Sequence, residues 1–69
     1  MNELFAIRTK HGGYWYCGSD SVDGLKRAQF HPVRCLFIEG NPADELHFIV
    51  ECGIPAENLE LVKMTVQVQ

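Results

Sequence analysis

The chain lacks the features that announce a membrane protein or a disulfide-rich secreted domain. Uninterrupted apolar runs reach only four residues, as in Cys35–Ile38, which is far too short to cross a bilayer. The three cysteines form an odd set without framework spacing, so structural disulfides are not expected. The first residues carry neither a cationic start nor a long apolar stretch, so we expect no signal peptide and predict a cytoplasmic protein.

Motifs for metal binding and catalysis are also missing. Zinc sites usually appear as Cys-x-x-Cys or His-x3-His pairs, whereas His31 and Cys35 are four apart and His47 and Cys52 are five apart. No Gly-x-Gly-x-x-Gly phosphate loop occurs, and a domain of this size has little room for a shielded cleft. We therefore expect no metal, no cofactor and no enzymatic activity.

What the sequence does hold is one small domain with an uneven charge. The 69 residues are 46% hydrophobic and carry a net charge of −3, and we treat residues 1–69 as a single domain. The first 35 residues hold five cations against three anions, and the last 34 hold one cation against six anions. This layout can steer a charged partner, although the two halves can also neutralise one another.

The first 17 residues predict a β-hairpin. An alternating run from Phe5 to Thr9 lies within a strand predicted from Glu3 to Lys10. A Gly-Gly pair follows, and the aromatic-rich residues Tyr14 to Cys17 are predicted to form the second strand. A two-residue turn places Trp15 on the same sheet face as Arg8 and Lys10, whereas a three-residue loop reverses this assignment. With the two-residue turn, the opposite face carries Phe5, Ile7, Thr9, Tyr14 and Tyr16.

The middle of the chain is less definite. Residues 18–24 are polar and are expected to form a loop. Residues 25–30 fit either a strand or a short helix, and we favour a strand that points Ala28 and Phe30 inward, because a glycine precedes the segment and a proline follows it. Residues 33–39 are expected to form a further extended stretch.

Residues 41–53 carry clear helix start and stop signals. Asn41 suits an N-cap, Pro42 suits the first helical position and Gly53 suits a C-terminal stop, so we predict a helix from Pro42 to Cys52. Its apolar stripe comprises Leu46, Ile49 and Val50, widened by Ala43 and Gly53.

The final strand is predicted from Leu59 to Val68, with Val62, Met64, Val66 and Val68 on its inner face. The whole pattern predicts an α+β domain, in which a small antiparallel sheet of three to five strands has one helix packed on one face, in ββ(β)αβ order. Leu36, Phe37 and Ile38 are consecutive, so both faces of that stretch are apolar. Because one helix covers only one face, we expect self-association, as a homodimer.

Two surfaces are candidates for binding. On the sheet, Arg8, Lys10, Trp15 and Arg27 combine cations with an aromatic ring, which suits a partner protein or a single-stranded nucleic acid. The alternative is an ordinary cation–π pair of Arg8 or Lys10 with Trp15 on a solvated face.

On the helix, Asp44, Glu45 and Glu51 could dock on a basic partner surface. The alternative is a solvated helix face, with Asp44 and Glu45 favourably placed near the helix N-terminus.

Several segments of the chain resemble small bacteriophage and prophage proteins. They are the Gly-Gly-Tyr-Trp turn at residues 12–15, the Lys-Arg-Ala-Gln-Phe strand at 26–30, the helix, and the Glu-Leu-Val-Lys-Met-Thr-Val strand at 60–66. The resemblance implies an accessory protein that acts by binding. Host-defence inhibitors such as anti-CRISPR proteins are similar in size, acidity and lack of catalytic motifs. We therefore predict a non-catalytic protein that binds and blocks a host protein in the bacterial cytoplasm, the alternative being a small nucleic-acid-binding protein.

Overall fold

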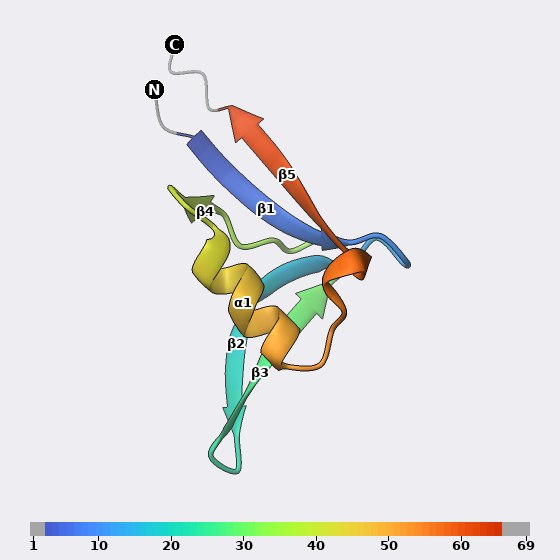
Figure 1. The fold of residues 1–69 in the computed structure, drawn as a ribbon, viewed down its shortest axis with the longest axis vertical. Coiled ribbons are helices and arrows are strands. Elements are labelled where there is room, and N and C mark those ends of the chain that lie inside the picture. The colour runs from blue at the N-terminus through green and yellow to red at the C-terminus, as the bar shows by residue number, and fades with distance from the viewer. Residues whose placement is uncertain (1–2, 66–69) are drawn as a thin grey trace.

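A computed structural model of the chain describes residues 3–65, which form five strands, one α-helix and one short 3₁₀ helix (Figure 1). In chain order these are β1 (Glu3–Thr9), β2 (Trp15–Val22), β3 (Leu25–His31), β4 (Ile38–Glu39), α1 (Ala43–Glu51), η1 (Ala56–Asn58) and β5 (Leu59–Thr65). The strands form one antiparallel sheet, so the predicted α+β class with a single helix is confirmed. No helix in this part of the chain is long and apolar enough to span a membrane.

Strand β1 is the centre of the sheet. Strand β5 pairs along its whole length, from Glu3 opposite Thr65 to Thr9 opposite Leu59. On the other edge, β2 pairs with β1 only near Arg8, and β4 pairs with its first half. Strand β3 pairs with β2 alone, and the β2–β3 hairpin extends away from the β1–β5 pair (Figure 1).

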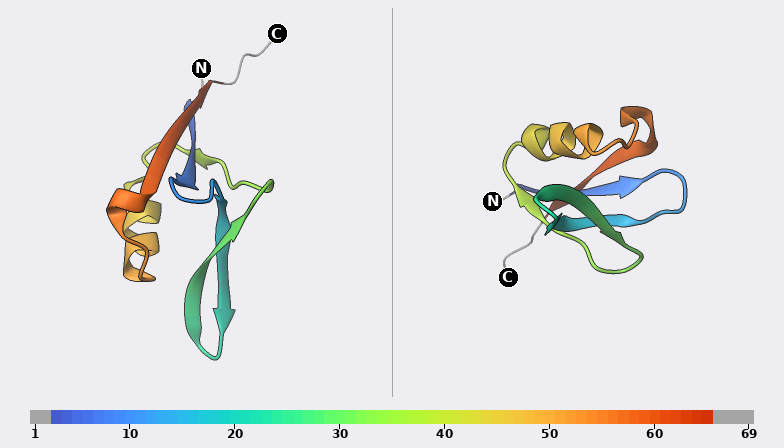
Figure 2. Two further views of the ribbon diagram at one scale, coloured as in Figure 1. Left: turned by 90° about the vertical axis from the view of Figure 1, so that its right-hand side faces the viewer. Right: turned by 90° about the horizontal axis from the view of Figure 1, so that it is seen from below.

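The two faces of the sheet have different coverings. The helix α1 lies on one face, here called the helix face, and the segment of residues 32–37 crosses the opposite face, here called the back face (Figure 2). Ile7, Tyr16, Ile49 and Leu59 form the buried core between the sheet and α1. Ala6 points to the back face and is also fully buried. The back face of β1 is therefore covered at least at Ala6.

The predicted first hairpin is confirmed, with the register of a two-residue turn. Arg8 lies opposite Trp15, and the backbone nitrogen of Thr9 donates a hydrogen bond of 2.8 Å to the carbonyl oxygen of Tyr14. Gly12 and Gly13 have φ values of 91° and 66°, a left-handed conformation that glycine adopts without steric cost. Trp15 therefore shares the back face with Arg8, as predicted.

The prediction of a polar loop over residues 18–24 was wrong. Strand β2 continues to Val22, which lies opposite Leu25, so only Asp23 and Gly24 form the turn. Their φ values of 52° and 77° are both left-handed, as a two-residue type I′ turn requires. An Asp-Gly pair between two apolar residues is a strong hairpin signal. The loop was predicted from the polar composition of residues 18–24, which does not distinguish a loop from a polar hairpin.

Residues 25–30 form a strand, as favoured, and Ala28 and Phe30 pack against the core. The stretch over residues 33–39 is mostly not a strand, because only its last two residues pair with β1. The chain turns directly after β3, where the Nδ1 atom of His31 accepts hydrogen bonds from the backbone nitrogens of residues 33 and 34 at 3.0 and 2.8 Å.

The predicted signals lie at both ends of α1, but Pro42 rather than Asn41 is the N-cap, so Pro42 precedes the first helical residue. The Oδ1 atom of Asn41 accepts a hydrogen bond of 3.0 Å from the backbone nitrogen of Ala43. At the other end, Gly53 has a φ of 104° and donates a backbone hydrogen bond to Val50. The observed helix begins one residue later and ends one residue earlier than predicted, within the usual uncertainty of helix boundaries.

Two predictions about which side chains face the core need correction. On α1, Val50 remains 41% exposed, whereas Phe48 packs against the core. On β5, the pairing of Thr9 with Leu59 directs the odd-numbered residues to the helix face, so Val62 and Met64 point to the back face. Val66 and Val68, the other residues predicted to face inward, lie outside the described residues.

Candidate interaction surfaces

Arg8 and Trp15 form the centre of the back face. The Arg8 guanidinium carbon lies 5.1 Å from the Trp15 ring centroid, within the range of a cation–π interaction. The Oε2 atom of Glu60 accepts hydrogen bonds from Nη2 and Nε of Arg8 at 2.8 and 3.1 Å. Trp15, Arg8 and Glu60 thus form one row across β2, β1 and β5.

The contacts in this row reduce the capacity of Arg8 to bind an anionic ligand. Its charge is offset by a carboxylate from the same chain, and its planar group rests near an indole ring. A phosphate group would have to compete with Glu60 for the guanidinium. Arg8 and Trp15 therefore form the ordinary cation–π pair that the sequence analysis gave as the alternative to a binding site.

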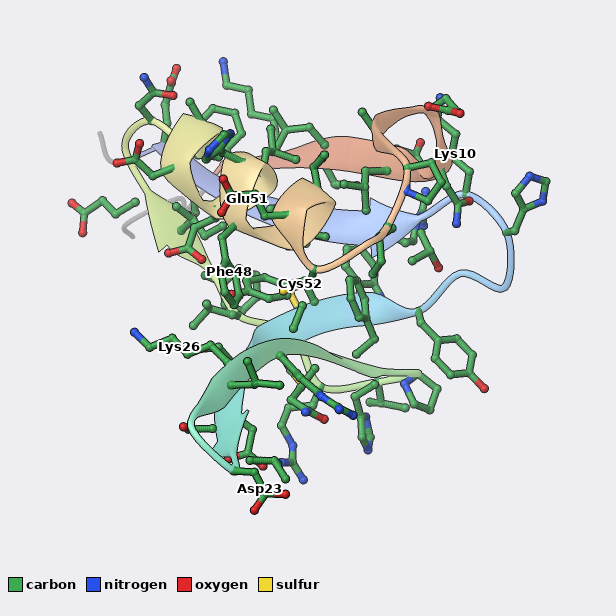
Figure 3. All side chains as sticks on the ribbon, turned by 60° about the horizontal axis from the view of Figure 1, so that its bottom comes forward. Lys10, Asp23, Lys26, Phe48, Glu51 and Cys52 are labelled. Carbon is green, nitrogen blue, oxygen red and sulfur yellow. The ribbon has the colours of Figure 1, made fainter. Side chains whose placement is uncertain are left out.

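The other two predicted cations do not join Arg8. Arg27 lies opposite Asp20 on the back face, four residues along β3 from His31, which pairs with Trp15. That spacing corresponds to about 13 Å along a strand. Lys10 lies in the turn after β1, and Figure 3 shows it well separated from Asp23 at the tip of the β2–β3 hairpin. The predicted sheet-face site is therefore dispersed.

The predicted acidic set on the helix is also divided. The hydroxyl of Tyr16 donates a hydrogen bond of 2.9 Å to Oε2 of Glu45, which belongs to the contact between α1 and the sheet. Tyr16 is only 2% exposed. Burial raises the pKa of its phenol, and the carboxylate of Glu45 raises that pKa further because it stabilises the protonated hydroxyl.

Asp44 and Glu51 are instead exposed on the solvent side of α1. The Oε1 atom of Glu51 accepts a hydrogen bond of 2.8 Å from Nε2 of His47, one helical turn earlier. Because Asp44, His47 and Glu51 are spaced by three and four residues, they form one continuous strip along the helix. This strip is the part of the predicted acidic surface that remains available to a partner.

Beside the strip lies an apolar hollow that sequence analysis missed. Its volume is about 300 Å³, and its lining residues come from α1, η1 and β5. These are Leu46, His47, Val50, Ala56, Leu59 and Leu61, here called the helix-side hollow. Val50 and Leu61 are 41% and 44% exposed. The sequence contained one signal for it, since Val50 belongs to the predicted apolar stripe of the helix and is not covered by the sheet.

A second exposed apolar segment lies on the back face. Val33 is 80% exposed and Phe37 is 52% exposed, both in the segment of residues 32–37. Ile38, the last of the three consecutive apolar residues, packs against the core instead. The apolar run therefore divides between the interior and the surface.

The three cysteines form no disulfide. All three are free thiols, and burial raises the pKa of the Cys35 thiol, which disfavours the thiolate. Within residues 3–65, no three His, Cys, Asp or Glu side chains come together in a way that could hold a metal ion.

Comparison of the chain with protein-family models, with curated proteins and with solved structures finds no match.

Proposed function

We propose that this chain is a non-catalytic, bacteriophage-type interaction protein that binds a host protein and blocks it, with the helix-side hollow and the Asp44–His47–Glu51 strip as its contact surface. The observation that carries the proposal is the exposed apolar hollow directly beside an exposed acidic strip. Its partner would insert an apolar side chain into the hollow and place cationic groups along the strip.

The distribution of apolar side chains supports a binding role. Among residues 3–65, eight large apolar side chains are exposed, whereas five hydrophobic residues other than proline are buried. Scattered exposed apolar residues are normal, but Val50 and Leu61 line a single hollow. Protein interfaces commonly centre on one apolar anchor in such a pocket, surrounded by a polar rim.

The charges of the described residues favour a protein over a nucleic acid. The exposed charges on α1 include Asp44 and Glu51, which would repel phosphate groups. On the back face, Arg8 is already paired with Glu60. The alternative of nucleic-acid binding therefore rests on Lys10, Arg27 and the partly exposed ring of Trp15, which are spread over the sheet.

A pull-down from a nuclease-treated bacterial lysate, analysed by mass spectrometry, tests the proposal. The tagged natural chain is compared with Val50→Asp and Val33→Asp, which place the same new charge on the helix side and on the back face. We expect one host protein to be enriched by the natural chain and by Val33→Asp, and to be lost with Val50→Asp.

Two outcomes would count against the proposal. Equal capture by all three chains would remove the helix-side hollow from the contact surface. Capture from an untreated lysate that is absent from the nuclease-treated lysate would favour the nucleic-acid alternative, and Trp15→Ala and Arg27→Ala would then be the variants expected to lose binding.

A further inference from the structure

We propose that β5 pairs edge to edge with β5 of a second copy of this chain, so that two sheets join into one across a two-fold axis. This inference is independent of the helix-side contact surface, because it concerns the backbone edge of β5. The two copies would present both helix-side hollows on the same side of the joined sheet.

The backbone of β5 offers a free row of hydrogen-bonding groups. The backbone nitrogen of Lys10 donates to the carbonyl oxygen of Asn58 at 2.7 Å, which identifies this pair as hydrogen-bonded in the β1–β5 ladder. Hydrogen-bonded and non-hydrogen-bonded pairs alternate in an antiparallel ladder. The backbone groups of Leu59, Leu61 and Lys63 therefore point outward, and within residues 3–65 no strand pairs with them.

The other sheet edges differ from this one. The outer edge of β3 lies against the C-terminal end of α1, where the Cys52 thiol donates a hydrogen bond of 3.8 Å to the carbonyl oxygen of Lys26. Phe48 and Cys52 lie between α1 and the β2–β3 hairpin (Figure 3). Strand β4 has only two residues. Strand β3 is as long as β5, but in the described part of the chain the outward backbone groups of β5 form no hydrogen bond with another element.

Strand β5 also carries few of the devices that protect an edge from pairing. It contains no proline, and its pairing with β1 has no bulge. Lys63 is the one cation on the strand, and its Nζ atom is held 2.9 Å from Oε1 of Glu3 in the same chain. The anion on the strand, Glu60, is held by Arg8. Both charged side chains of β5 are therefore paired within the chain, so neither needs a partner from a second strand.

A strand that adds to this edge meets apolar side chains on both faces of the sheet. Leu61 points to the helix face, while Val62 and Met64 point to the back face. Strand β5 itself has this uncommon pattern, which makes a second copy the fitting partner.

The two-fold register can be derived from the outward-pointing groups. Antiparallel pairing about an axis at Val62 places Leu61 opposite Lys63 of the second copy and matches all seven residues of the strand. No like charges then lie directly opposite one another.

Sedimentation equilibrium of the full chain tests the pairing. Between about 5 and 500 µM, mass action predicts a rise in apparent mass from that of one 7.8 kDa chain toward twice that value. A single-chain mass over the whole range would overturn the proposal.

A backbone variant tests the edge without changing any side chain. The chain can be assembled from residues 1–51 and 52–69 by ligation at Cys52, which allows N-methylation of the Leu61 backbone nitrogen. We expect this variant to remain a single chain, whereas the ligated chain of natural sequence dimerises. A dimer that survives N-methylation would overturn the proposal.

Hydrogen exchange of the natural chain provides a readout that needs no variant. At the higher concentration, the amides of Leu61 and Lys63 should exchange at least about tenfold more slowly than at the lower one. The amide of Val33, which donates to His31 on the back face and lies outside β5, is the internal control and should not change. Equal slowing at Val33, or no slowing on β5, would contradict the edge pairing.

Discussion

The Tyr16 hydroxyl and the Glu45 carboxylate, 29 positions apart in the chain, form a 2.9 Å hydrogen bond between the sheet and α1. Tyr16 is one of the few fully buried side chains of the described fold, and its ring lies 5.8 Å from that of Phe30. One side chain thus links β2, β3 and the helix. The bond also removes Glu45 from the acidic surface that the sequence suggested.

Replacing Tyr16 by Phe should therefore destabilise the fold. Loss of a hydrogen bond to a charged group costs about 1.5–3 kcal/mol, and the Glu45 carboxylate is left half-buried without its donor. Urea unfolding of Tyr16→Phe measures the difference in the free energy of unfolding. Tyr14→Phe, at an exposed tyrosine, is the control and should change stability by less than about 0.5 kcal/mol. Equal effects at the two positions would show that the hydrogen bond contributes little.

The raised pKa of Tyr16 predicts alkaline sensitivity. The ordinary phenol pKa is 10.0, and burial beside Glu45 raises it in the folded state. The stabilisation is complete below pH 10 and is lost as pH rises from there toward the folded-state pKa, because only the unfolded chain ionises readily. The expected slope in that window is about 1.4 kcal/mol per pH unit. Unfolding of the natural chain and Tyr16→Phe between pH 9 and 12 should show this extra slope only in the natural chain.

The Asp23-Gly24 turn should be sensitive to a methyl group at Gly24. Its φ of 77° is left-handed, and a non-glycine residue there costs about 1–2 kcal/mol. No atom lies within 4 Å of a Cβ built on Gly24, so the cost is conformational rather than steric contact with neighbours. Thermal unfolding of Gly24→Ala should show a lower Tm, and Ser21→Ala on the adjacent strand should not. An unchanged Tm for Gly24→Ala would argue against the tight turn.

The turn also shows what the sequence could reveal. The first hairpin and both helix ends were predictable because they depend on local chemistry, namely glycine at left-handed positions and an asparagine before a proline. The Asp-Gly turn was equally local, but was overlooked among polar neighbours.

Other features were beyond local reasoning. The face that each β5 side chain occupies depends on its register with β1, which starts from Thr9 opposite Leu59. The helix-side hollow requires α1, η1 and β5 to be placed together, and the division of the acidic residues follows from Tyr16 on a distant strand. No periodicity in the sequence specifies these contacts.

The ion pair of Arg8 and Glu60 should be weak but measurable. Both side chains are more than a third exposed, so solvent screens the interaction. A double-mutant cycle with Arg8→Ala and Glu60→Ala, read by urea unfolding, should give a coupling of about 0.2–1 kcal/mol. The coupling should shrink in high salt. A coupling that is unaffected by salt would indicate that packing of Arg8 on Trp15 dominates.

Calorimetry with the purified host protein that the natural chain captures tests whether the helix-side hollow is the contact surface. Binding through the helix-side hollow predicts that Val50→Asp raises the Kd by at least about tenfold, which corresponds to 1.4 kcal/mol, while Val33→Asp leaves the Kd unchanged. Circular dichroism should show that both variants remain folded. Equal Kd values for the natural chain and Val50→Asp would contradict the account, because the partner would then bind elsewhere.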